Sequence, residues 1–194
     1  MDKISYALGL GIGQQIKNMH IEGFSIEDFS QSIRDILEGN PTAMSSREAQ
    51  QMLNHYFEKH AKEQAQLAIA EGKVFLEENA RRPEVTQTKS GLQYEVLSEG
   101  SGRSPKATDT VRCHYEGRLL DGSVFDSSYQ RGEPAVFGLN QVIKGWTEGI
   151  ALMPVGSKWR LYIPQNLGYG ERQTGKIPPY STLIFDVELL GIEK

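Results

Sequence analysis

The spacing of the hydrophobic positions changes near residue 84 of the chain. Before that point apolar residues recur three or four positions apart, as in Ile4 and Leu8, and this is the period of one face of an α-helix. After it they alternate with polar residues in short runs such as 111–115, and this is the period of a half-buried β-strand. The pattern therefore predicts an α+β chain, with helices over 1–84 and a curled antiparallel sheet over 85–194.

Capping residues predict where the helices of the first part begin and end. Ser25 is a suitable N-cap for a helix that ends at Gly39, because glycine readily adopts the left-handed conformation found there. Ser45 followed by Glu48 has the spacing of a capping box. Since no proline occurs from there to about Ala80, a single long helix is predicted over this stretch.

The first helix carries three glycines at alternate positions, Gly9, Gly11 and Gly13. Glycine inside a helix costs up to about 1 kcal/mol relative to alanine, so its presence favours close approach of another helix. Three helices in fewer than 85 residues make only a thin core. We expect residues 1–60 to form a homodimer, and the alternative is a monomeric helical bundle.

The second part contains short strands separated by turn residues. Apolar and polar residues alternate in the runs 92–96, 111–115, 159–163 and 185–189. Asp121-Gly122 predicts a hairpin turn of type I′ between two of the strands. The run 142–150 fits a short helix instead, and we expect it to fill the concave face of the sheet.

Composition supports a division of the chain into residues 1–84 and 85–194. The first part holds 6 of the 20 glycines and 2 of the 8 prolines, whereas the second holds 14 and 6. The first part has a net charge of −4, and in the second 12 basic residues balance 12 acidic ones. We therefore expect a helical dimerisation domain with a long connecting helix, followed by a separate sheet domain.

Several classes of function are disfavoured by simple counts. A net charge of −4 argues against general nucleic-acid binding, and no apolar run approaches the ~20 residues of a membrane-spanning helix. The opening residues lack the basic stretch and apolar block of a secretion signal, and Cys113 is the only cysteine. These features favour the cytoplasm, with the periplasm or cell envelope as the alternative if a leader has been removed.

The side chains show no arrangement suited to covalent or metal catalysis. Ser127 and Ser128 have no evident paired histidine and aspartate, and His114 is the only histidine of the second part. His20, His55 and His60 lack the spacing of metal ligands, so we expect neither a metal site nor a cofactor.

Six ordered motifs in residues 85–194 resemble the FKBP-type peptidyl-prolyl cis-trans isomerases. They are the segments 111–117 (VRCHYEG), 122–128 (GSVFDSS), 141–146 (QVIKGW), 168–170 (GYG), 177–179 (IPP) and 182–190 (TLIFDVELL). The first part is similar, more loosely, to the N-terminal dimerisation region of the bacterial branch that includes the macrophage infectivity potentiator. Its cues are the opening segment 3–9 and the long helix.

The resemblance implies catalysis of X–Pro bond rotation without a covalent intermediate. Peptide rotation must overcome a barrier of about 18–20 kcal/mol, because the amide resonance is lost on twisting. A twisted amide has less charge separation than a planar one, so an apolar pocket that excludes water favours it. The pocket only has to hold the proline ring and anchor a neighbouring carbonyl while the bond rotates.

The same resemblance implies which residues form this pocket. The catalytic residues would be Tyr115, Phe125, Asp126, Tyr169 and Phe185, and the substrate-binding residues Phe137, Val142, Ile143, Trp146 and Ile177. Trp146 would be the floor beneath the proline ring, and the Tyr169 hydroxyl and Ile177 N–H would donate to substrate carbonyls. Ile177 precedes Pro178, which favours extended backbone at Ile177, so we expect its N–H to point outward.

The expected partners follow from this function. They are unfolded or partly folded proteins that contain proline, with macrolides of the tacrolimus or rapamycin type as possible inhibitors. In a dimer, two pockets on helical arms would engage one client twice, which raises the effective affinity. The alternative to an isomerase is mainly a client-binding chaperone or adaptor with little turnover.

Overall fold

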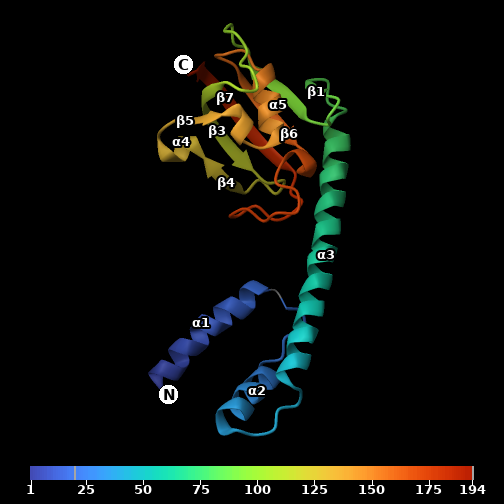
Figure 1. Cartoon of the computed structure of the whole chain (residues 1–194), viewed down its shortest axis with the longest axis vertical. Coiled ribbons are helices and arrows are strands. Elements are labelled where there is room, and N and C mark those ends of the chain that lie inside the picture. Colours follow the sequence, from blue (N-terminus) through green and yellow to red (C-terminus); the bar gives the residue numbers. More distant parts are fainter. Residues whose placement is uncertain (20, 194) are drawn as a thin grey trace. The chain divides into compact units, whose positions relative to one another are not determined.

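The first unit of the fold is helical and the second is built around one sheet. The computed structural model describes residues 1–19 and 21–193 (Figure 1). Contacts divide the chain into two units, Met1–Tyr56 and Phe57–Lys194. The helices are α1 (Lys3–Met19), α2 (Ile26–Glu38), α3 (Ser46–Asn79), α4 (Ser128–Arg131) and α5 (Lys144–Leu152), with short 3-10 turns η1 (Leu139–Gln141) and η2 (Gln165–Leu167). The strands are β1 (Val85–Gln87), β2 (Gln93–Ser98), β3 (Thr110–Arg118), β4 (Val124–Ser127), β5 (Ala135–Gly138), β6 (Lys158–Ile163) and β7 (Leu183–Ile192).

The predicted caps of the first part are confirmed. The Ser25 hydroxyl accepts a hydrogen bond from the N–H of Asp28, and Gly39 ends α2 with a φ of 72°. At the start of α3, the N–H of Glu48 donates to the Ser45 hydroxyl at 3.2 Å, and the Ser45 N–H donates to the Glu48 carboxylate at 2.8 Å. This reciprocal pair is a capping box, so both orphan donors find an acceptor.

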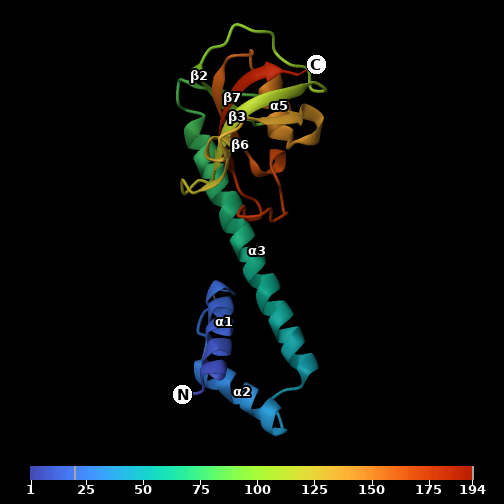
Figure 2. The same ribbon diagram turned by 90° about the vertical axis from the view of Figure 1, so that its left-hand side faces the viewer.

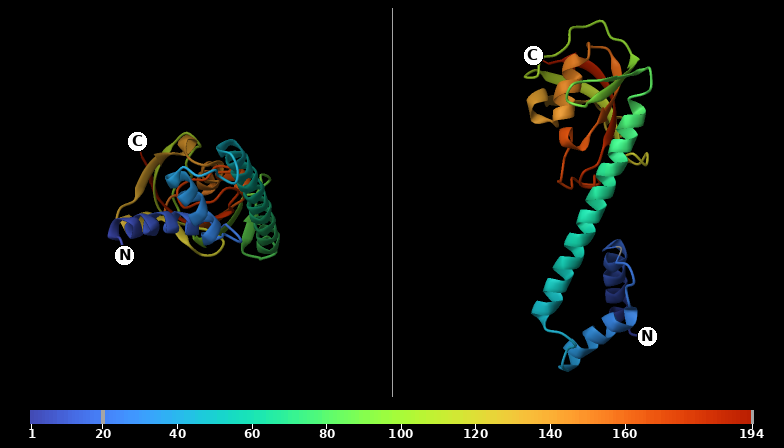
Figure 3. Two further views of the ribbon diagram at one scale, coloured as in Figure 1. Left: turned by 90° about the horizontal axis from the view of Figure 1, so that it is seen from below. Right: turned by 90° about the vertical axis from the view of Figure 1, so that its right-hand side faces the viewer.

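The helices of Met1–Tyr56 enclose no core of their own. No side chain in the described part of this unit is buried, and α1 and α2 are two separate rods, drawn in blue in Figure 3. Apolar side chains on α1 stand in solvent, for example Ile4 at 73% and Leu8 at 64% exposure. The amphipathic pattern is therefore present, but a single chain does not cover it. Within the described residues, no helix is both long and apolar enough to cross a membrane.

The C-terminal half of α3 packs on the sheet and belongs to the second unit. The Phe75 ring lies 5.9 Å from that of Tyr162 between centroids, and the buried Asn79 amide donates to Gln93 at 2.8 Å. Gln93 in turn donates to the Leu76 carbonyl at 2.8 Å. The contact boundary thus falls within α3, earlier than the change from helix to strand that suggested a division between residues 84 and 85.

The sheet of the second unit is antiparallel throughout and runs in the order β1-β2-β6-β7-β3-β4, with β5 paired to β3. It curls around α5, as Figure 2 shows. The helix approaches closely because Gly145 and Gly149 have no side chains. A Cβ would lie 2.6 Å from Ile163 at Gly145, and 2.9 Å from Leu161 at Gly149. The predicted fold, a helical region followed by a curled antiparallel sheet around a short helix, is confirmed.

The hairpin between β3 and β4 differs from the predicted type I′ turn. The N–H of Gly122 donates to the Leu119 carbonyl, and the N–H of Leu119 donates to the Ser123 carbonyl, each at 3.0 Å. Gly122 has a φ of 84°, but Asp121 does not share the left-handed conformation that a type I′ turn requires. The Asp121 side chain instead accepts from the N–H of Ser123 at 2.8 Å. This local bond stabilises a longer loop.

Candidate functional site

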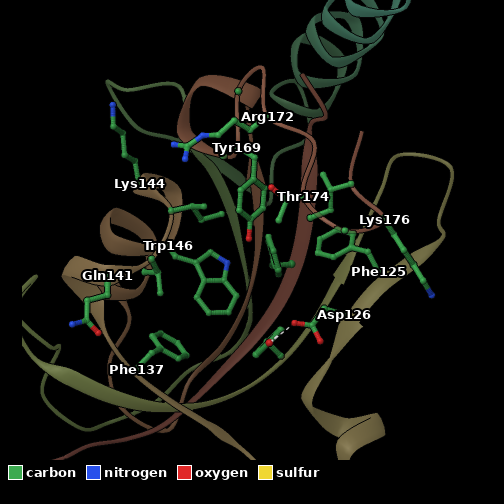
Figure 4. A pocket seen from close by; sticks show the side chains of 18 of the residues that line it. Phe125, Asp126, Phe137, Gln141, Lys144, Trp146, Tyr169, Arg172, Thr174 and Lys176 are labelled. Carbon is green, nitrogen blue, oxygen red and sulfur yellow. Dashed lines mark hydrogen bonds between the residues drawn. The ribbon is translucent and has the colours of Figure 1, made fainter. Parts of the chain in front are cut away.

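One cavity of about 910 Å³ opens between the concave face of the sheet, α5 and the loop after η2 (Figure 4). The structure brings together here all ten residues that the sequence resemblance assigned to a pocket, although they come from seven parts of the fold. They are Tyr115 on β3, Phe125 and Asp126 on β4, Phe137 on β5, Val142 and Ile143 before α5, Trp146 on α5, Tyr169 and Ile177 in the loop, and Phe185 on β7.

The Trp146 indole is packed among three other aromatic rings. Its centroid lies 4.9 Å from that of Tyr115 and 5.0 Å from that of Phe185, with both rings nearly perpendicular to it. The Phe137 ring lies 5.0 Å away on another side. The buried indole N–H has no hydrogen-bond partner in the described part of the chain. Ring contacts therefore fix the tryptophan, and edge-to-face geometry of this kind is favourable for aromatic pairs.

Gly117 makes room for two of these rings, and sequence reasoning missed this role. A Cβ at Gly117 would lie 2.5 Å from the Phe125 ring and 2.6 Å from the Phe185 ring. The two phenylalanines meet edge to face at 5.4 Å, directly above the bare backbone. The glycine that ends the VRCHYEG segment thus allows one wall of the cavity to form.

Asp126 is held by two partners at the edge of the cavity. The Tyr115 hydroxyl donates to one carboxylate oxygen at 2.5 Å, and Arg131 forms an ion pair with the other. A second guanidinium nitrogen of Arg131 donates to the Tyr115 hydroxyl at 2.9 Å. Burial, followed by the hydrogen bond to Asp126, raises the pKa of Tyr115, so its hydroxyl stays a donor. Arg131 was not among the predicted site residues, because it follows the recognised motif and belongs to the short helix α4.

Tyr169 places its hydroxyl inside the cavity, where Figure 4 shows it pointing towards the space above Trp146. Burial raises the pKa of Tyr169, and the negative charge of Asp126 raises it further. The phenol is therefore neutral over the ordinary pH range and is available as a hydrogen-bond donor.

The expected role of the Ile177 N–H is corrected by the structure. That N–H already donates to the Thr174 carbonyl at 2.9 Å, and the Thr174 N–H donates back to the Ile177 carbonyl. Pairing within the loop, rather than an outward orientation, satisfies the backbone before Pro178.

The Ile143 N–H, by contrast, has no intramolecular acceptor among the described residues. It lies just before the first turn of α5, where helix geometry leaves N–H groups unpaired.

The rim of the cavity is polar. The lining residues that motif reasoning did not select include Gln141, Lys144, Asn166, Arg172, Thr174 and Lys176. They are exposed side chains on the 3-10 turns η1 and η2, at the start of α5 and in the loop after η2. Their place at the rim follows from the path of the backbone, because a polar run such as 172–176 does not by itself indicate that it borders a pocket.

The described residues hold no group of three or more histidine, cysteine, aspartate or glutamate side chains placed to bind a metal ion. Of the histidines considered above, His20 lies outside the described residues. His114 contacts the Ser128 hydroxyl at 3.0 Å and stacks on Tyr129, so it is part of a packed cluster. Cys113 is fully buried, and burial raises the pKa of its thiol to about 12, which makes it unreactive.

Comparisons with known proteins agree with this geometry. A family model described as "FKBP-type peptidyl-prolyl cis-trans isomerase" matches residues 101–190, and one described as "Domain amino terminal to FKBP-type peptidyl-prolyl isomerase" matches residues 1–96. The chain is 49% identical to the FKBP-type 22 kDa peptidyl-prolyl cis-trans isomerase of Escherichia coli, over 97% of this chain and 93% of that protein.

Two further relatives match along nearly the whole chain. The outer membrane protein MIP of Legionella longbeachae is 36% identical, over 100% of this chain and 86% of that protein. The crystal structure of FkpA from Escherichia coli superposes with a TM-score of 0.79 at 36% identity, covering 98% of this chain and 95% of the other.

Proposed function

The chain belongs to the FKBP-type peptidyl-prolyl cis-trans isomerases, which act on X–Pro bonds, and we propose that its reaction takes place in the cavity above Trp146. The observation that carries this assignment is the convergence of all ten expected residues on one cavity. The substrates are proline-containing peptide chains.

The aromatic floor and walls lower the barrier to rotation, because they favour the twisted form of the amide. The proline ring lies on the face of Trp146, and the Phe125 and Phe185 rings close one side around it. Water is displaced from the amide on binding. Because the twisted amide has less charge separation than the planar one, it loses less hydration and is favoured in this environment.

Two donors hold the substrate while the bond turns. The Tyr169 hydroxyl lies in the cavity and Ile143 lines it, and neither this hydroxyl nor the Ile143 N–H has an acceptor among the described residues. Each is placed to donate to a carbonyl next to the proline. Asp126 is fixed by Tyr115 and Arg131, so its charge stays at the edge of the site and does not move into it.

A pair of tyrosine variants tests the site. Tyr169→Phe removes a donor from the cavity, and we expect it to lower kcat/KM for cis-to-trans conversion of a short X–Pro peptide by about three- to tenfold, the usual worth of one hydrogen bond. Tyr129→Phe removes a hydroxyl that donates to Glu188 outside the cavity, and serves as the matched control. A tacrolimus-type macrolide is expected to inhibit the wild type by occupying the same space. Equal rates for both variants would refute the assignment of Tyr169.

We extend the proposal to a homodimer formed by residues 1–60. Its support is the absence of buried side chains in the described part of Met1–Tyr56, where Leu8 and Leu10 are more than half exposed. Contiguous apolar faces that stay exposed on a folded chain are typical of interaction surfaces. The open flank of α1 at Gly9, where no atom lies within 4 Å of a Cβ position, would admit a partner helix closely.

Light scattering tests the dimer. At micromolar concentration we expect twice the chain mass for the wild type and the chain mass for Leu8→Glu, because a charge placed in an apolar interface is left unpaired. The matched control is Gln15→Glu, which adds the same charge to α1 without replacing an apolar residue. A wild type of monomeric mass would contradict the proposal.

The same apolar faces favour client binding as a second activity. Binding of an unfolded protein by the Leu8→Glu variant would support this activity.

The cytoplasmic location expected from the sequence finds no support among the relatives. One of them is named an outer membrane protein. We therefore favour the alternative, a place in the cell envelope. Fractionation of cells producing the natural protein tests this, because recovery with the soluble cytoplasmic fraction alone would overturn it.

A further inference from the structure

Positive charge gathers at the mouth of the isomerase cavity. Three cationic side chains line it: Lys144 at the start of α5, and Arg172 and Lys176 in the loop that follows Tyr169. All three residues are exposed. In Figure 4 they stand on different sides of the opening, with Lys144 beside α5, Arg172 near Tyr169 and Lys176 beyond Phe125.

Neighbouring carboxylates do not neutralise this charge. Asp126 is the one carboxylate among the described lining residues, and its oxygens are bound to Arg131 and to the Tyr115 hydroxyl. No ion pair within the described chain involves Lys144, Arg172 or Lys176. Glu171 is next to Arg172 in the chain, but it is exposed and does not line the cavity. The amino end of the nine-residue helix α5 adds a partial positive charge on the same side.

The sign of the rim is opposite to that of the whole chain. The net charge is −4, and residues 85–194 hold equal numbers of acidic and basic residues. A cationic rim is thus a local arrangement and not a reflection of composition. Charge concentrated around a binding cleft raises the association rate of oppositely charged ligands and disfavours those of like charge.

We propose that this isomerase selects X–Pro bonds flanked by aspartate or glutamate. This rests on the proposed function, since it concerns the same cavity. Because the cations stand on different sides of the opening, a carboxylate side chain close to the proline meets one of them whether it comes before or after the proline. The aromatic floor binds the proline itself, and the cations of the rim attract negatively charged side chains next to that proline in the substrate.

Matched peptides test the proposal with the full chain. Two series are used, with glutamate, glutamine or lysine placed either one residue before or one residue after a common proline. At an ionic strength of ~0.01 M, where charges act over about 30 Å, we expect kcat/KM for the better glutamate peptide to exceed that of its glutamine counterpart by about three- to tenfold. The lysine peptide should be the slowest. At ~1 M salt, where the screening length is about 3 Å, the ratio should approach one.

A triple variant identifies the cations responsible. The triple variant combines Lys144→Gln, Arg172→Gln and Lys176→Gln. It should bring the ratio of kcat/KM between the glutamate and glutamine peptides to about one. The single variants then show which cation interacts with a carboxylate before the proline and which with one after it. The charge-matched control replaces Lys62, Lys73 and Lys89 by glutamine, since these residues are exposed and do not line the cavity. The ratio is the readout, because a general loss of activity does not change it.

The outcomes separate this inference from the proposed function. If the glutamine peptides are accelerated but neither series favours glutamate, the charge selection is wrong and the isomerase site stands. A glutamate preference that survives in the triple variant, or that disappears equally in the control, also overturns it. If no peptide is accelerated over buffer, the proposed function itself fails.

Discussion

Two leucines show how differently the two units of this chain are stabilised. Leu8 on α1 and Leu161 on β6 both occupy the apolar positions of a regular pattern. Leu161 is 0% exposed because β6 lies between two other strands and beneath α5, whereas Leu8 remains 64% exposed. A periodic pattern indicates which face of a helix or strand is apolar and has to be buried. It does not indicate whether the same chain or another molecule buries that face.

The difference matters for function because the isomerase chemistry requires fixed geometry. The cavity belongs to the unit with a continuous core. Contacts between aromatic rings, and glycines that leave room for those rings, determine the position of each wall there. The described residues of Met1–Tyr56 form no such core, and their apolar faces are available to another molecule. One unit therefore suits precise binding of a small group, and the other suits assembly.

Truncating the two leucines should separate the units most strongly. Leu161→Ala removes a fully buried side chain, and we expect it to lower the free energy of unfolding of the sheet unit by about 2–5 kcal/mol. Leu8→Ala should leave that transition within about 0.5 kcal/mol. Urea unfolding followed by tryptophan fluorescence measures it, since Trp146 and Trp159 both lie in the sheet unit. A large effect of Leu8→Ala on this transition would mean that the units are not energetically separate.

Much of the fold was predictable because its signals are local. The caps at Ser25 and Ser45 depend on residues three positions away, and the alternation in β3 reflects one buried and one less buried face. The exact residue at which the second unit begins was not predictable in this way. Its inclusion of the end of α3 depends on contacts such as that between Asn79 and Gln93, which a helical period does not reveal.

The candidate site divides along the same line. The aromatic residues belong to motifs, so the resemblance found them, and the structure places them around one cavity. Arg131, Arg172 and Lys176 lie outside those motifs, and Lys144 lies within one but carries no pattern that marks it as a site residue; all four reach the site only through the folded backbone. The role of Ile177 was inferred from a local preference for extended backbone, and it failed because the loop closes on itself with a hydrogen bond to Thr174.

A second prediction concerns where the sheet unit begins. A fragment of residues 57–194 keeps the α3 contacts, whereas residues 85–194 alone would leave Gln93 without the Asn79 amide and the Leu76 carbonyl. The shorter fragment loses these two hydrogen bonds, each worth about 0.5–1.5 kcal/mol, and the contact between the Phe75 and Tyr162 rings, so we expect it to fold but to be less stable by about 2–3 kcal/mol. Both fragments should isomerise a short peptide, because the lining of the cavity lies wholly within residues 115–185.

The control for this comparison is Asn79→Ala in the longer fragment. It should lose about 1 kcal/mol, part of the difference between the two fragments, because it removes one of the two contacts to Gln93. Equal denaturation midpoints for residues 57–194 and 85–194 would show that the end of α3 contributes nothing to the unit.

Two glycines in helices offer the finest test of the comparison. Gly72 in α3 is buried, and a Cβ there would lie 2.3 Å from the Thr182 hydroxyl oxygen. Overpacking outweighs the better helix propensity of alanine, so Gly72→Ala should destabilise the sheet unit by about 1 kcal/mol. Thr182→Ala removes the obstructing oxygen, and in that background Gly72→Ala should become neutral or stabilising, as a double-mutant cycle would detect.

At Gly9 of α1, the effect of the same substitution should depend on whether a second chain packs against the helix. No atom lies within 4 Å of a Cβ at Gly9 in one chain, so in a monomer Gly9→Ala would stabilise α1 by up to about 1 kcal/mol. In a dimer with closely packed α1 helices, the added methyl group meets the partner and weakens association instead. Sedimentation over a range of concentrations distinguishes the two: weaker dimerisation of Gly9→Ala places a second chain against this face, and unchanged or tighter assembly means that the cover for α1 lies elsewhere.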